Sequence, residues 1–245
     1  RLESMFFGNG GGSSNTAFAV AMLMLGVAVT YWSRRTLLAT ALSSSAKSSS
    51  SPERLAALWR GAVETMLLDE TLMLAPAASD AESRDSFLPA GVPEPLNRGR
   101  TFALTAFDPP GVSRSREDNA RANAELWIAI QALHPPRAWP GFGVDVGEQW
   151  REDGFILNWP DDDPATRDAV LALASDFDQG AIYEYYALPG GALRRRTVGA
   201  KLAQIHEETP MKLIAPDVAA ELRDAHPIFQ LPWAGPASRL LKTTT

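Results

Sequence analysis

Between residues 101 and 188, short apolar segments alternate with two longer amphipathic segments in an order that few folds accommodate. The apolar segments 101–107, 142–146, 155–159 and 181–188 are typical of strands, because they are short and bounded by Pro, Gly or Asp. Ser115 and Asp163 are predicted helix N-caps, each followed by an apolar stripe of helical period. The stripes consist of Leu126, Ile130 and Leu133 in one helix, and Val170, Leu173, Ala174 and Phe177 in the other.

This strand–helix–strand–strand–helix–strand order predicts a ferredoxin-like α+β sandwich. Two right-handed crossovers place both helices on one face of a four-stranded antiparallel sheet. Residues 192–198 follow a Pro-Gly-Gly turn and are expected to add an edge strand. The predicted core domain therefore spans residues 101–198.

A charge-free apolar run precedes this domain, from Ala17 to Trp32. Its sixteen residues span roughly 24 Å as a helix, close to the thickness of a bilayer core. We interpret residues 16–42 as a transmembrane helix; a signal peptide and a buried helix are the alternatives. Arg34, Arg35 and Lys47 follow the run, so the C-terminal part is expected on the cytoplasmic, stromal or matrix side.

The other segments are expected to be linkers, a helix and irregular arms. Residues 1–15 and 43–51 are Gly- or Ser-rich and predict a flexible N-terminus and a linker. Residues 52–100 predict a helix up to Leu74 and then a proline-rich arm, and residues 199–245 a second arm with a helix at 215–224. Proline-rich arms with large apolar side chains are typical of contact surfaces. The predicted partner contacts are Phe87, Leu88, Phe229 and Trp233.

Composition excludes several kinds of site. The chain has no cysteine, which excludes disulfides, thiolate metal sites and cysteine nucleophiles. Its net charge is −6, and because residues 1–51 carry four basic and one acidic side chain, the remainder carries about −9. Such an acidic domain repels phosphate backbones, so nucleic acid is not an expected partner. The three histidines match no metal motif, and we predict no metal site.

Five short segments in the core carry a resemblance to a known family. They are FALTAFDP (102–109), EDNARAN (117–123), GFGV (141–144), DGFIL (153–157) and FDQGAIY (177–183). Together they resemble a bacterial and algal family known only as domain of unknown function 3293. Asp108 stands where that pattern usually has Asn. The resemblance covers about residues 100–188 and implies a shared fold but no activity.

Asp108, Asn119 and Gln179 form the one candidate ligand site, together with Thr105. They lie at the end of a predicted strand or at a helix end, and such ends can converge in a ferredoxin-like sandwich. Polar groups there either bind a small ligand or hold turns through side-chain to backbone hydrogen bonds. No pair of catalytic groups is evident, and no catalytic residue is predicted.

Two hypotheses for the function follow. The first is a non-catalytic accessory subunit of an organelle membrane complex, with an algal photosystem–antenna supercomplex in a thylakoid membrane favoured over a respiratory complex. The Ala- and Arg-rich composition and a start without methionine suit a processed organelle protein. No cofactor is required, although a peripheral pigment or lipid contact suits this role. The alternative is a membrane-tethered small-ligand-binding module or enzyme that uses the Asp108 corner.

Overall fold

A computed structural model of the chain describes residues 57, 59–67, 71–161, 163–202 and 206–236. The chain divides into two compact units, residues 1–49 and 50–245, and all described residues belong to the second. The predicted flexible N-terminus, membrane span and Ser-rich linker lie outside the described residues. No helix in the described ranges is long and apolar enough to cross a bilayer.

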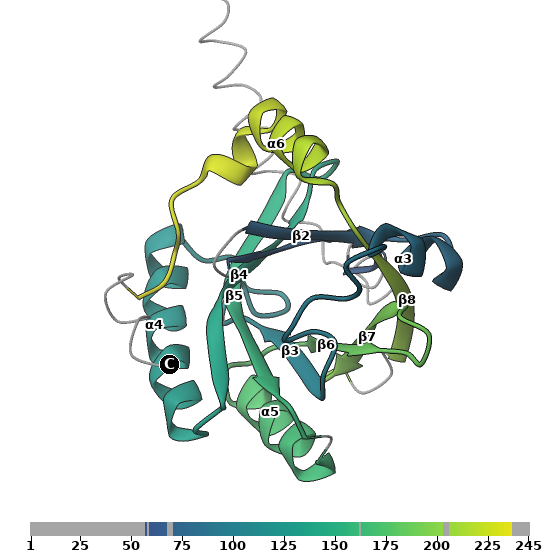
Figure 1. Cartoon of the computed structure of the whole chain (residues 1–245). Helices are drawn as coiled ribbons and strands as arrows, with labels where there is room; N and C mark the ends of the chain where they lie inside the picture. The colour runs from purple at the N-terminus through teal and green to yellow at the C-terminus, as the bar shows by residue number, and fades with distance from the viewer. Residues whose placement is uncertain (1–56, 58, 68–70, 162, 203–205, 237–245) are drawn as a thin grey trace, which may run out of the picture. The chain divides into compact units, whose positions relative to one another are not determined.

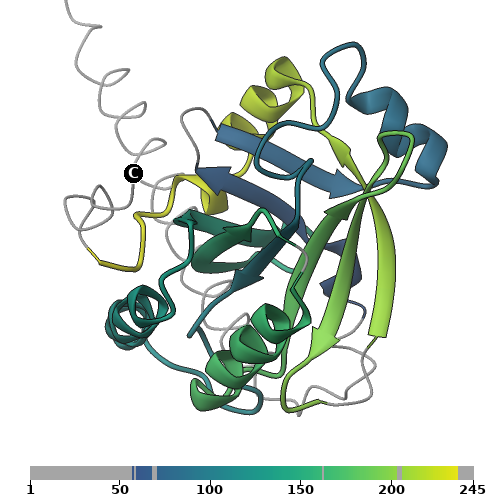
Figure 2. The same cartoon turned by 60° about the horizontal axis from the view of Figure 1, so that its bottom comes forward.

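The described residues form a closed barrel of antiparallel strands (Figures 1 and 2). Neighbouring strands pair in the order β1-β2-β8-β7-β6-β3-β5-β4, and β4 pairs with β1 to close the ring. The strands are β1 (Val63–Leu67), β2 (Thr71–Pro76), β3 (Arg100–Leu104), β4 (Arg137–Asp145), β5 (Trp150–Trp159), β6 (Ala181–Ala187), β7 (Leu193–Gly199) and β8 (His206–Leu213). The described helices are α3 (Asp80–Ser86), α4 (Arg116–Ala132), α5 (Pro164–Asp176), α6 (Pro216–Ala225) and the short 3₁₀ helix η1 (Pro227–Gln230).

The predicted ferredoxin-like fold is therefore wrong. The four predicted strands do lie side by side, in the order β6-β3-β5-β4, but this sheet does not end at β6 or β4. β4 pairs with β1, and β6 pairs with β7. β7 also pairs with β8, so it is hydrogen-bonded on both sides and is not an edge strand. An open sheet leaves unpaired N–H and C=O groups at its edges, and closure into a barrel removes those edges.

The helix predicted up to Leu74 is also wrong in its second half, where the chain forms the hairpin of β1 and β2. Met, Leu, Ala and Glu in this segment favour a helix by intrinsic propensity. Their positions also fit the two-residue period of a strand, because Glu64 and Met66 both face the barrel interior. Leu74 on the partner strand faces the interior as well. Pairing with β4 and β8 supplies long-range hydrogen bonds that override the local preference.

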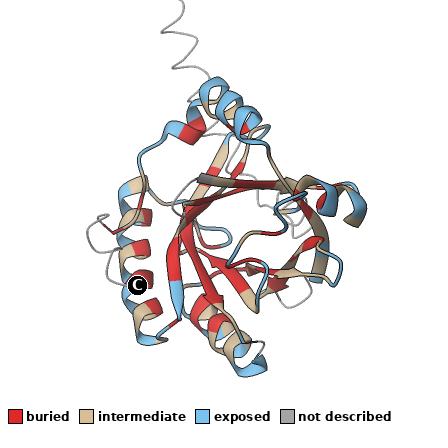
Figure 3. Cartoon of the chain, viewed as in Figure 1, coloured by how far each residue is buried: buried red, intermediate tan, exposed pale blue. Residues whose placement is uncertain are grey.

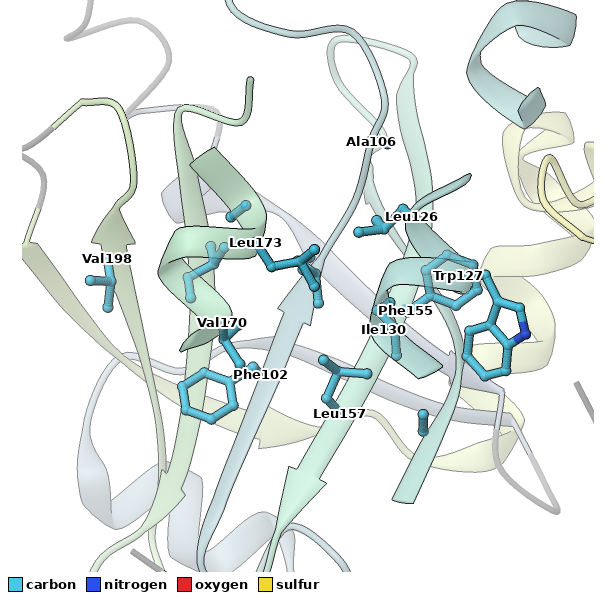
Figure 4. Packing of buried hydrophobic residues seen from close by; sticks show 14 residues of the cluster. Phe102, Ala106, Leu126, Trp127, Ile130, Phe155, Leu157, Val170, Leu173 and Val198 are labelled. Atoms are coloured by element: carbon cyan, nitrogen blue, oxygen red, sulfur yellow. The ribbon is translucent and has the colours of Figure 1, made fainter. Parts of the chain in front are cut away.

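Two of the helices cover one side of the barrel, and their apolar stripes build the outer core (Figure 3). α4 and α5 pack on the outward faces of β3, β5 and β6, and Figure 4 shows this cluster. The predicted stripe residues Leu126, Ile130, Val170 and Leu173 are buried in it, and Phe177 is partly buried. Both predicted caps are confirmed, since the Ser115 and Asp163 side chains accept hydrogen bonds from backbone N–H groups of the first turns.

The opposite faces of the same strands fill the barrel interior. Ala103 and Ile156 alternate with the helix-facing Phe102 and Phe155, as the two-residue period of a strand requires. Three apolar side chains of the segment 87–96 pack into one end of the barrel, against Met66, Leu74 and Tyr185; they are Phe87, Val92 and Leu96. That end is therefore closed by the chain itself, and the hollow part of the barrel lies at the other end.

Candidate functional site

A cavity of about 100 Å³ occupies the end of the barrel where β3 finishes and β5 and β6 begin. It exists because inward positions carry little or no side chain: Gly141 and Gly143 on β4, Gly154 on β5 and Ala181 on β6. At Gly143, an added Cβ would lie 3.0 Å from Glu64 Oε1. The lining comprises Trp59, Glu64, Ala103, Leu104, Thr105, Asp108, Pro110, Gly141, Phe142, Gly143, Trp150, Glu152, Gly154, Phe155, Ile156, Gln179, Gly180, Ala181, Ile182 and Tyr183.

Glu64 is the most enclosed polar group of this lining. Its side chain projects from β1 and is only 3 % exposed, and Oε1 has no hydrogen-bond partner. The nearest cation is Arg195, whose Nη1 lies 3.6 Å from Glu64 Oε1. Burial raises the pKa of Glu64 to about 7, and the Arg195 charge opposes that rise. The Glu64 carboxyl is therefore divided between its protonated and ionised forms at neutral pH.

Glu152 is the second carboxyl in the cavity. It projects inward from β5 and remains partly accessible because it faces the cavity. Burial raises the pKa of Glu152 well above its ordinary value, and the charges of Asp108 and Glu64 raise it further. Two carboxyls that repel each other in one apolar space favour the state in which at least one holds a proton.

Arg195 lies beneath the cavity and is fully buried. Its guanidinium donates hydrogen bonds to the carbonyl oxygens of Trp59 (2.6 Å), Arg60 (2.9 Å) and Ala62 (2.9 Å). It also stacks over the Tyr183 ring, 4.4 Å from its centroid. Arg195 therefore holds the chain that enters β1 and is not part of the cavity lining.

Trp59 lines the cavity. Its carbonyl oxygen also accepts a hydrogen bond from the Tyr183 hydroxyl at 3.1 Å. A Cβ placed on Gly180 would lie 3.2 Å from the Trp59 ring and 3.0 Å from Pro110, so these three residues meet closely. The absence of a side chain at Gly180 allows the indole to lie there.

The predicted corner of Asp108, Asn119, Gln179 and Thr105 does come together, and its hydrogen bonds hold the turn after β3. Asn119 exchanges two hydrogen bonds with Asp108, and Gln179 donates one to the Phe107 carbonyl at 2.9 Å. Asp108 has φ 23°, a left-handed conformation that Asn and Asp tolerate best among residues with side chains. Asp108, Thr105 and Gln179 also line the cavity, whereas Asn119 does not.

The four predicted partner contacts lie in different environments. Phe87 is 2 % exposed inside the barrel, and Phe229 is 8 % exposed beneath α6, with its ring 6.4 Å from that of Phe142. Trp233 packs edge-on against Phe155, with ring centroids 5.8 Å apart. Leu88 alone is well exposed, at 63 %. The three aromatic side chains pack within this chain, and their contact with a partner stays a prediction.

A buried charge cluster that the sequence analysis missed attaches the C-terminal arm to the barrel. Asp153 on β5 pairs with Arg151 at 2.7 Å and with Arg116 at 2.5 Å. Arg151 also donates to the carbonyls of Ile228, Phe229 and Leu231. The two-residue spacing of Arg151 and Asp153 was a possible signal, since it places opposite charges on one face of the strand.

The described residues hold no cluster of His, Asp or Glu side chains arranged to bind a metal ion. His134 and His206 are exposed, and His226 is partly exposed, at the start of η1.

Fold and site together define an antiparallel barrel with an acidic internal cavity. Residues 104–182 match a family described as a protein of unknown function (DUF3293), which confirms the resemblance predicted from the sequence. No curated protein and no solved structure matches the chain. Most of the cavity lies within the matched segment, because only Trp59, Glu64, Ala103 and Tyr183 of its lining fall outside it.

Proposed function

We propose that this protein binds a small organic molecule inside the barrel. The observation that carries the proposal is a cavity of about 100 Å³ lined by Glu64, a residue whose buried carboxyl oxygen Oε1 has no hydrogen-bond partner. A buried polar atom left unpaired costs roughly 1–3 kcal/mol, so such atoms are uncommon unless a ligand or water satisfies them. An unpaired acceptor beside an open space is typical of a binding site.

The size of the cavity limits the ligand. A dry cavity of about 150 Å³ holds benzene with its six non-hydrogen atoms, so a space of about 100 Å³ encloses about four. The cavity is partly open, so a larger ligand can extend outward from it. Aromatic and aliphatic walls, from Tyr183 and Ile156 among others, favour an apolar body.

The test compares the protein with a variant in which the cavity is filled. Cyclopentylamine, cyclopentanol and cyclopentanecarboxylate serve as matched probes with one ring and one polar group. We expect at least one probe to shift the backbone amide signals of Gly141, Gly154 and Gly180 in nuclear magnetic resonance spectra. Ala181→Leu fills the cavity and should abolish the shifts, whereas Ala220→Leu, on the exposed face of α6, should leave them unchanged.

Two outcomes would overturn the proposal. One is that none of the probes shifts these signals. The other is that Ala181→Leu responds like the unmodified protein, because binding would then occur elsewhere. The accessory-subunit hypothesis and the expected lack of catalytic activity are untested by these observations and stay predictions from the sequence.

A further inference from the structure

The ionisable Asp, Glu, Lys, Arg and His side chains that line the cavity are all acidic. Glu64, Glu152 and Asp108 line it, and among the described residues no Lys, Arg or His does. These carboxyls come from β1, β5 and the turn after β3, so they face the same space from three elements. In their ionised form these groups repel a ligand carboxylate or phosphate and attract a cation.

Arg195 does not reverse this sign. It is fully buried, it lies outside the lining, and both of its terminal nitrogens are bonded to main-chain carbonyls. Its ion pair with Glu64 is long, at 3.6 Å, and has no hydrogen bond. Glu64 therefore lines the cavity with a carboxyl group that has an oxygen left without a hydrogen-bond partner.

The walls provide a place for the rest of such a ligand. Ile156 from β5, Tyr183 from β6 and Trp59 present apolar or aromatic surface. Aromatic faces attract cations as well as apolar groups, so they are compatible with a charged nitrogen nearby.

Resting on the proposed function, we infer that the cavity ligand is a small amine: a protonated nitrogen bound by Glu64 and Glu152, attached to an apolar body that lies against Ile156 and Tyr183. The nitrogen donates to the unpaired Glu64 oxygen and its charge favours the ionised carboxyls. Binding therefore releases protons from the cavity, because the free site holds protonated carboxyl groups near neutral pH.

The pH dependence depends on every titratable or charged group that faces Glu64. Arg195 approaches it from β7, Tyr183 and Tyr185 from β6, and Glu152 from β5. The pKa values of both tyrosines are raised by burial, so they remain neutral between pH 6 and 8. The affinity for an amine should therefore rise between pH 6 and pH 8, as the carboxyls become easier to ionise, and the affinity for an alcohol should not.

The experiment titrates the full-length protein with the same three probes at pH 6 and pH 8. At pH 8 we expect cyclopentylamine to bind about tenfold or more tightly than cyclopentanol, because a hydrogen bond to a charged group contributes more than a neutral one. Cyclopentanecarboxylate should bind most weakly. Glu64→Gln should reduce amine binding to the level of the alcohol and remove the rise with pH. Glu125→Gln, on the exposed face of α4, is the charge-matched control and should leave both unchanged.

The outcomes separate this inference from the proposed function. If cyclopentanol or cyclopentanecarboxylate binds as tightly as the amine and Ala181→Leu abolishes that binding, the cavity is a ligand site but the amine inference is wrong. If Ala181→Leu has no effect on any probe, both are wrong. Glu152→Gln provides a second variant, should Glu64→Gln fail to show the native spectrum; unchanged amine selectivity in that variant also overturns the inference.

Discussion

Arg195 Nη1 lies 3.6 Å from Glu64 Oε1, and both side chains are buried within the barrel. The two residues lie on β7 and β1, strands that are not neighbours in the ring, so the contact crosses the interior. Arg195 directs its hydrogen bonds to the chain before β1 and leaves Glu64 free toward the cavity. The same arginine thus stabilises the entry to the barrel and maintains an available carboxyl beside it.

Removal of the Glu64 charge should stabilise the protein at neutral and alkaline pH. Its folded-state pKa of about 7 lies above the ordinary value of 4.5, so the folded protein binds more protons than the unfolded chain between these values. The free energy of unfolding attributable to Glu64 is therefore greatest below about pH 4.5 and falls as pH rises through 7. The loss is of the order of 3 kcal/mol.

Urea unfolding at pH 5 and pH 8 provides the measurement. The free energy of unfolding should decrease less from pH 5 to pH 8 in Glu64→Gln than in the unmodified protein. At pH 8, Glu64→Gln should be more stable than the unmodified protein. Glu125→Gln controls for the change in net charge. An unchanged pH dependence in Glu64→Gln would show that the Glu64 carboxyl does not titrate in this range.

Replacement of Arg195 by Met should destabilise the fold by about 3–5 kcal/mol, because it leaves three carbonyl groups without their donor and removes the cation nearest the buried Glu64 carboxyl. The neighbouring Arg194 provides a matched control: its ion pairs with Asp80 and Glu208 are partly exposed, and such pairs contribute about 0–1 kcal/mol. Chemical denaturation of both variants compares the two. If replacement of Arg194 costs as much stability as replacement of Arg195, the role assigned to Arg195 is contradicted.

Phe229→Ala should lower the stability of the isolated protein by about 3 kcal/mol, since its ring is buried against Phe142 beneath α6. A role in contacting a partner, as the sequence suggested, predicts almost no change. Leu88→Ala provides the control, because Leu88 is 63 % exposed and its removal should cost less than about 0.5 kcal/mol. Thermal melting of the purified variants discriminates between the two interpretations.

Truncation of the outer core should be equally informative. Leu126→Ala and Leu173→Ala should each cost about 2–5 kcal/mol, because both side chains are buried between a helix and the barrel. Ile128→Ala on the same helix as Leu126 should have little effect, as Ile128 is 71 % exposed. If Ile128→Ala loses as much stability as Leu126→Ala, α4 does not pack on the barrel through the face described here.

Local features were predictable from the sequence because their physical causes lie within a few residues. Ser115 and Asp163 begin helices through side-chain contacts to the next turn, and the spacing of Leu126 and Ile130 defines the buried face of α4. The turn at Asp108 was also recognisable, since its partner Asn119 lies only eleven positions away. These signals located β3, α4, β5, α5 and β6, although the ends of the strands differed by several residues.

Closure of the barrel and assembly of the cavity were decided by tertiary structure alone. β1 carries helix-forming residues and becomes a strand only because β4 and β2 pair with it on either side. Glu64 and Glu152 meet across the cavity as a result, although no local pattern relates them. The hydrogen bonds and burial that determine these features join residues far apart in the chain, so neither periodicity nor capping signals contain them.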